Sequence, residues 1–188
     1  MATETDIANM ALASVGGSML TSLPDDTSVE ADLCRLFYTQ ARDEVLEFVQ
    51  PTFATKRFEA NLLESTPEWE FDYQFEKPGD FLKMLETQDD QDGFEYRVER
   101  DRILSNSDAL NIRYIFRLED TSKFSSSFTR AVAFNLAAKI AYAITKDRLL
   151  ARELFEAYLD AAQRSATIDS QNGSLRSVRL TTLIGDRI

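Results

Sequence analysis

The sequence predicts an α+β fold: an antiparallel helical bundle with an inserted small antiparallel β-sheet and an extended C-terminal arm. Three observations lead to this prediction. Apolar residues recur with helical spacing before residue 50 and again after residue 126. Short runs with strand-like alternation lie between them. The last eighteen residues contain no aromatic side chain. The predicted division is 1–53 (N-terminal helices), 54–119 (β-sheet region), 120–170 (C-terminal helices) and 171–188 (arm).

The first predicted helix covers residues 3–15. Thr3 and Asp6 have the spacing of a capping box, in which each residue satisfies a backbone N–H group of the other. Gly16-Gly17 then ends the helix, because glycine readily adopts the left-handed conformation found at helix C-termini.

The second predicted helix begins near Ser28 and ends at Pro51. Thr27 is its expected cap, with Glu30 reaching back in a second capping box. The apolar residues of this helix are more numerous than one buried helical face requires. Its second apolar surface therefore packs against either the rest of the chain or another copy of it.

The middle of the chain predicts one small antiparallel sheet. Turn residues punctuate it, and Asp92-Gly93 is typical of a tight hairpin turn between two of the strands. The predicted strands are 56–63, 69–75, 81–85, 94–98 and 112–118.

Helical periodicity returns after the strands. Ser126 or Ser127 is the expected cap of a helix through residue 144, and Asp147 begins another that runs to about residue 168. The apolar run 131–144 is too short to span a bilayer core of roughly 30 Å, and it contains Lys139. We therefore expect no membrane span.

Composition argues against several function classes. Asp and Glu number 32 against 21 Lys and Arg, and the net charge of −11 repels nucleic acid. The absence of histidine removes the usual zinc sites and the Ser-His-Asp and Cys-His nucleophiles. The single cysteine, Cys34, is interpreted as a buried small hydrophobe, and it cannot form an internal disulfide. Because the N-terminus also lacks a basic signal-peptide start, we expect the chain to stay in a cytoplasm. The missing histidine and the single buried-type cysteine lead us to expect no catalytic activity, metal or cofactor.

One stretch comes close to a calcium-binding loop. With Gln88 as position 1, Asp90, Asp92, Gly93 and Glu99 occupy positions 3, 5, 6 and 12 of an EF-hand loop. An EF-hand needs a helix on each side, whereas the flanking runs here read as strands. A solvated hairpin is therefore the preferred interpretation.

Two groups of motifs stand in a characteristic order along most of the chain. The first group is Leu12, Gly16, Ser22-Leu23, Asp25, Tyr38, Arg42-Asp43, Phe53-Ala54 and Arg57. The second group is Trp69, Tyr73, Pro78, Asp80, Leu82 and Leu85. With the two closing helices, this order resembles the head-to-tail adaptor family of short-tailed phages, called tail tubular protein A.

The resemblance implies a structural virion protein that is assembled in the host cytoplasm. Such adaptors form a ring, expected to be dodecameric, between the portal protein and the tail nozzle protein, and genomic DNA passes through the lumen without specific binding. A ring subunit needs a second helix face for its neighbour. The expected subunit-interface residues are Leu33, Phe37, Tyr38, Leu46 and Val49.

The resemblance also bears on the C-terminal arm, because C-terminal segments in this family engage the portal. Alternating apolar side chains in the arm would seat in portal grooves, and its arginines would pair with acids at the rim. The expected portal-binding residues are Leu175, Arg176, Val178, Arg179, Leu180, Leu183 and Arg187.

Two other classes of function compete with this interpretation. The first is a small acidic helical protein that binds a host or phage protein partner as a monomer or dimer. The second is a carboxylate-dependent nuclease, which would use Asp89, Asp90, Asp92 and Glu99.

Overall fold

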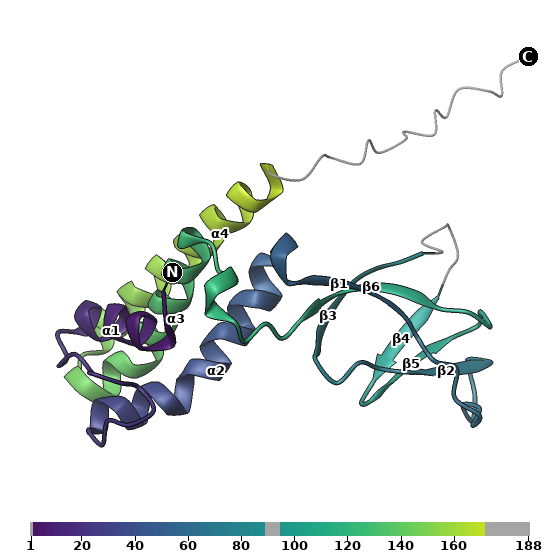
Figure 1. Cartoon of the computed structure of the whole chain (residues 1–188), viewed down its shortest axis with the longest axis horizontal. Helices are drawn as coiled ribbons and strands as arrows, with labels where there is room; N and C mark the ends of the chain where they lie inside the picture. The colour runs from purple at the N-terminus through teal and green to yellow at the C-terminus, as the bar shows by residue number, and fades with distance from the viewer. Residues whose placement is uncertain (1, 89–94, 172–188) are drawn as a thin grey trace, which may run out of the picture.

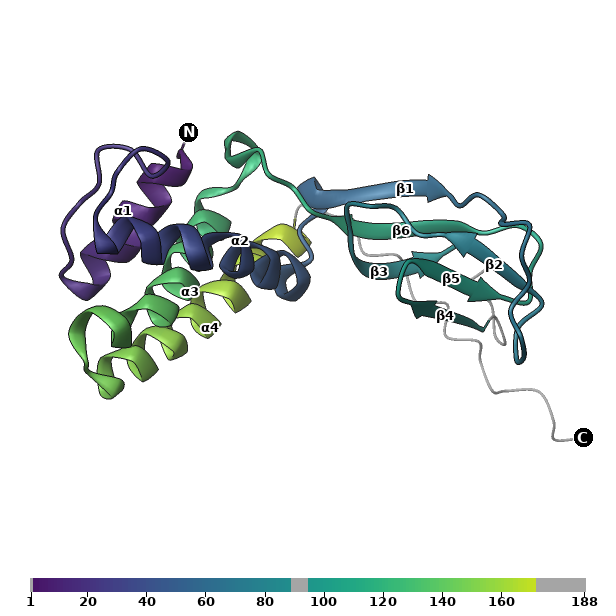
Figure 2. The same ribbon diagram turned by 90° about the horizontal axis from the view of Figure 1, so that it is seen from below.

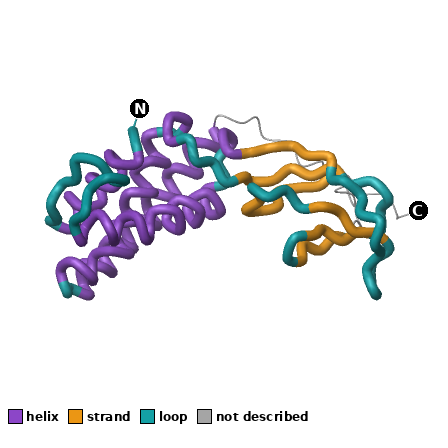
Figure 3. Tube along the Cα trace, turned by 60° about the horizontal axis from the view of Figure 1, so that its bottom comes forward, coloured by secondary structure: helices purple, strands orange, loops and turns teal. Residues whose placement is uncertain are grey.

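The computed structural model describes residues 2–88 and 95–171. Within these residues, four α-helices pack at one end of an elongated molecule, and two three-stranded antiparallel sheets lie at the other (Figure 1, Figure 2). Figure 3 shows the same separation, with helices in purple and strands in orange. The α+β class is therefore confirmed. The β region differs from the prediction in forming two sheets instead of one.

The helices begin and end close to the predicted positions, and α1 has the predicted capping box. The hydroxyl of Thr3 accepts from the backbone N of Asp6 at 3.1 Å, and the Asp6 carboxylate accepts from the backbone N of Thr3 at 2.8 Å. Gly16 follows in the left-handed conformation, with φ of 71°. The helices are α1 (Glu4–Val15), α2 (Val29–Val49), α3 (Ser126–Thr145) and α4 (Arg148–Gln171).

The cap predicted for α2 was wrong by one residue. Ser28, and not Thr27, is the N-cap, and its hydroxyl accepts from the backbone N of Ala31 at 3.2 Å. This register places Glu30 at the second helical position, one residue short of the position from which a capping box reaches back.

The caps of the last two helices also lie near their predicted positions. Ser125, and neither Ser126 nor Ser127, caps α3, and its hydroxyl accepts from the backbone N of Phe128 at 3.2 Å. Asp147 begins α4 as predicted, because its carboxylate accepts from the backbone N of Leu149 at 2.8 Å.

The strands form two sheets with the orders β1-β6-β3 and β2-β5-β4. Local pattern missed one strand, β5, because its apolar residues Ile103 and Leu104 are adjacent and do not alternate with polar ones. The strands are β1 (Thr55–Glu59), β2 (Tyr73–Glu76), β3 (Phe81–Thr87), β4 (Tyr96–Glu99), β5 (Arg102–Ser105) and β6 (Asn111–Phe116).

The predicted hairpin between β3 and β4 was also wrong. The two strands lie in different sheets, where β3 pairs with β6 and β4 pairs with β5. The β4–β5 connection is Arg100-Asp101, which closes a much shorter loop than one from β3. Pairing with β5 also buries Ile103 between the sheets. The proposed Asp92-Gly93 turn itself lies outside the described residues.

The core has a helical part and a part between the sheets. α3 packs against α1, α2 and α4 and supplies small side chains such as Ala131, Ala137 and Ala141 to the helical part. In β6, Ile112 and Tyr114 face the core between the sheets. Ile115 lies on the opposite face of β6 and packs into the helical core, so sheet β1-β6-β3 is anchored on the helices.

Asp43 ties the helices to the strand region. Its Oδ2 accepts from Arg117 Nε at 2.8 Å, and its Oδ1 accepts from Arg42 Nε at 2.9 Å. Arg117 directly follows β6, so this ion pair joins α2 to the chain returning from the sheet. The side chain of Arg42 is only 4% exposed, and the carboxylate of Asp43 compensates its buried charge.

Two further contacts hold the same junction. Both carboxylate oxygens of Asp169 in α4 accept from Thr52, one from its backbone N at 2.9 Å and one from its hydroxyl at 3.0 Å. Thr52 opens the short 3-10 turn Thr52–Ala54 between α2 and β1. The rings of Phe53 and Phe124 both lie against Phe128 of α3, with centroid distances of 5.3 and 4.8 Å. The two connections to the strand region are thus fixed on α3 and α4.

Replacing Asp43 with alanine should lower the free energy of unfolding by about 2–4 kcal/mol, because Arg42 would stay buried without its carboxylate. The matched control is Asp160→Ala, which removes an exposed ion pair with Arg164 on α4 and should cost no more than about 0.5 kcal/mol. Urea unfolding followed by circular dichroism measures both. Equal losses in the two variants would contradict the role of Asp43.

Candidate functional site

The expected subunit-interface residues of α2 lie mostly inside the chain's own core. Tyr38, Leu46 and Val49 are buried there, and Leu33 and Phe37 are partly buried against the same core. The prediction that these five side chains are available to a neighbouring subunit therefore needs correction for the three buried ones. α2 packs against α1, α3, α4 and β3, so the chain itself covers most of the surplus apolar surface.

The expected portal-binding residues lie outside the described part of the chain. This holds for Leu175, Arg176, Val178, Arg179, Leu180, Leu183 and Arg187. Their role stays a prediction.

Exposed apolar side chains do occur on the helices, at other positions. Phe48 of α2 and Phe155 of α4 are 46% and 49% exposed, and both rings lie near the buried ring of Tyr158, at centroid distances of 6.4 and 5.7 Å. Leu159 is one helical turn beyond Phe155 and is also exposed. We call Phe48, Phe155 and Leu159 the aromatic patch. Apolar groups gathered on a surface in this way are typical of protein contacts.

A groove of about 420 Å³ runs between α3 and α4. Phe134, Ala157 and Ala161 contribute apolar surface to it, and the two arginines Arg130 and Arg164 also line it. Phe155 and Arg164 are about two and a half helical turns apart, which places them on opposite sides of α4. The groove and the aromatic patch therefore lie on opposite sides of this helix.

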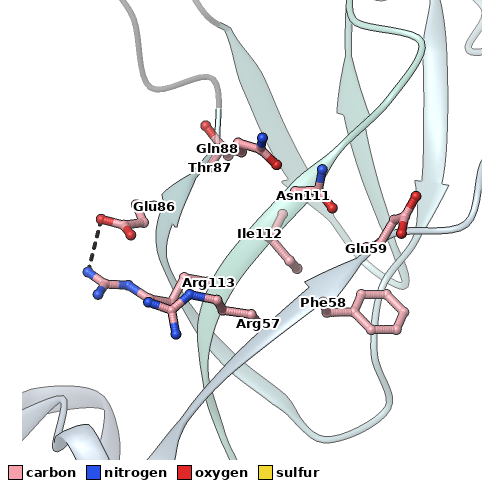
Figure 4. A pocket seen from close by; sticks show the side chains of 9 residues that line it. All are labelled: Arg57, Phe58, Glu59, Glu86, Thr87, Gln88, Asn111, Ile112 and Arg113. Carbon is pink, nitrogen blue, oxygen red and sulfur yellow. Dashed lines mark hydrogen bonds and ion pairs between the residues drawn. The ribbon is translucent and has the colours of Figure 1, made fainter.

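A hollow of about 400 Å³ lies on sheet β1-β6-β3 (Figure 4). Arg57 of β1 and Arg113 of β6 are direct cross-strand partners within it. Glu86 of β3 accepts from Arg113 Nη2 at 2.9 Å, and the Arg113 Nε is buried without a hydrogen-bond partner among the described residues. We call Arg57 and Arg113 the arginine pair.

Sequence reasoning missed the aromatic patch and the arginine pair for different reasons. Phe155 and Leu159 have the i, i+4 spacing of one helix face, so the periodicity of α4 contained the signal. Arg57 and Arg113 are brought together only by the register of β1 against β6, which no local pattern reveals.

The residues weighed for chemistry are buried, exposed or outside the described residues. Cys34 is fully buried in the helical core, as predicted, and burial, with a smaller contribution from Glu30, raises the pKa of its thiol to about 11. Of the possible nuclease acids, Asp89, Asp90 and Asp92 lie outside the described residues, and Glu99 is exposed on β4. Within residues 2–88 and 95–171, no three cysteine or acidic side chains gather closely enough to hold a metal ion.

Comparisons with protein families and with curated proteins give no match for this chain. Among the helices of the described residues, none has both the length and the apolar character needed to cross a membrane.

The thiol of Cys34 should react slowly with a colour-forming disulfide reagent. With a pKa near 11, its thiolate fraction at pH 8 is about 100-fold below that of an ordinary thiol, and burial slows attack further. Unfolding the protein with urea should expose Cys34 and let its thiol react completely. The control is Ser18→Cys in a Cys34→Ala background, where the new thiol replaces an exposed side chain and should react at once. Rapid reaction of native Cys34 would contradict its burial.

Proposed function

We propose that this chain is a structural subunit of a phage virion, a head-to-tail adaptor that forms a ring between the portal protein and the tail nozzle protein. Genomic DNA passes through the lumen of this ring without specific binding. The ring is expected to be dodecameric, on the resemblance described above to the tail tubular protein A family.

The observation that carries the proposal is the pair of uncovered surfaces on opposite sides of α4. The aromatic patch lies on one side, and the α3–α4 groove lies on the other. A ring built from head-to-tail contacts needs two different surfaces on each subunit, one for each neighbour. A protein that binds a single host or phage partner needs only one such surface, so this feature favours the ring over the acidic helical regulator.

The charge of the chain also supports a conduit over a nuclease. A net charge of −11 repels the DNA backbone on average, which suits a channel through which DNA slides and does not suit an enzyme that must grip it.

Electron microscopy of the purified protein mixed with its portal protein tests the ring directly. The wild-type chain should form rings on the portal. Phe155→Glu should abolish the rings while keeping the helical circular dichroism and lowering the melting temperature only slightly. The half-exposed ring gives up its contact with Tyr158, and a charge enters the subunit contact. Ser18→Glu adds the same charge to an exposed position outside both helical surfaces and should still assemble. Single, isolated copies of the wild-type chain on the portal would refute the proposal.

Removing residues 172–188 should separate docking from folding. Within the described residues, no hydrophobic side chain after Ala162 is buried, so the truncated chain should keep its helicity and melting temperature. Loss of the apolar and arginine side chains of the arm should abolish portal binding, measured by co-sedimentation. Unchanged docking of the truncated chain, or failure to fold, would rule out the arm as the docking segment.

A further inference from the structure

The arginine pair is an unusual arrangement for a sheet. Arg57 and Arg113 are directly opposite on neighbouring antiparallel strands, where like charges destabilise the pairing. Figure 4 shows both side chains extending from the same face of the sheet, at the hollow that they line. An anion placed between them would remove this repulsion.

The charge of the pair is only partly compensated. Glu86 accepts from Arg113 at 2.9 Å, but within the described residues no carboxylate forms an ion pair with Arg57, whose side chain is exposed. The Nε of Arg113 also has no hydrogen-bond partner there, although it is buried. The exposed guanidinium of Arg57 thus remains for a second anion.

We propose that the arginine pair binds a single carboxylate side chain presented by another protein. The planar guanidinium fork matches a carboxylate with two parallel hydrogen bonds. Asn111, the next residue along the same face of β6, also lines the hollow.

A carboxylate fits this hollow better than the phosphate of a nucleic acid. Glu59 and Glu86 also line the hollow, so a ligand with one negative charge meets less repulsion than a phosphate chain. The net charge of −11 repels a polyanion at long range as well. The site is on the sheets and is independent of the helical surfaces in the proposed ring, so either proposal can fail without the other.

Fluorescence anisotropy with a labelled octapeptide that carries one glutamate flanked by serines tests the site in the full chain at low salt. Wild-type protein should bind the peptide saturably. Arg57→Gln should weaken binding about 10-fold or more, because a charge-assisted hydrogen bond is lost. Arg57→Lys keeps the charge without the fork and should bind with intermediate affinity. Lys123→Gln removes the same charge from an exposed position in the turn Thr121–Lys123 and should bind like wild type.

Melting of the free protein separates a binding role from a structural one. Arg57→Gln should melt no lower than wild type, because it relieves the like-charge contact with Arg113. A clear drop in melting temperature would mean that Arg57 serves the fold. The proposal is also overturned if the wild-type chain does not bind the peptide, if Arg57→Gln binds it equally well, or if a labelled single-stranded oligonucleotide binds more tightly than the peptide.

Discussion

The burial of α3 among three other helices is the constraint on which the architecture depends. A helix with neighbours on several sides can be approached closely only where its side chains are small, and alanines at Ala131, Ala137 and Ala141 meet this requirement. The one buried amide of this helix, Asn135, is satisfied by the Ala41 carbonyl at 3.1 Å and by Glu44 at 3.0 Å. Its hydrogen bonds fix α2 against α3 in one register, and the strands that follow α2 are positioned from there.

Local chemistry made the helices predictable, and pairing at a distance limited the prediction of the sheets. The Thr3–Asp6 box and the glycine stop need only neighbours in sequence, so the bounds of α1 follow from the residues themselves. The surplus apolar surface of α2 was also read correctly, but periodicity measures the width of an apolar face and not which element covers it. Tyr38 and Leu46 are covered by the same chain for that reason.

The candidate sites show the same limit more strongly. The arginine pair exists because β1 and β6 are antiparallel neighbours in one register, and a shift by one residue would send Arg57 to the other face of its sheet. The predicted β3–β4 hairpin was wrong because β4 pairs with β5, to which it is joined by a shorter loop. Both outcomes depend on which strands pair with each other, and the sequence of one strand alone does not show its partner.

The contact between Asp169 and Thr52 gives the molecule a mechanical property. Asp169 lies two residues before the end of α4, and its two hydrogen bonds reach the turn that leads into β1. Tension applied to the chain beyond Gln171 is therefore shared with the base of the strand region before it can peel the last turn of α4 away from α3. The end of α4 and the turn that leads into β1 thus act as one attachment point, so a force on the end of α4 also acts on the strand region.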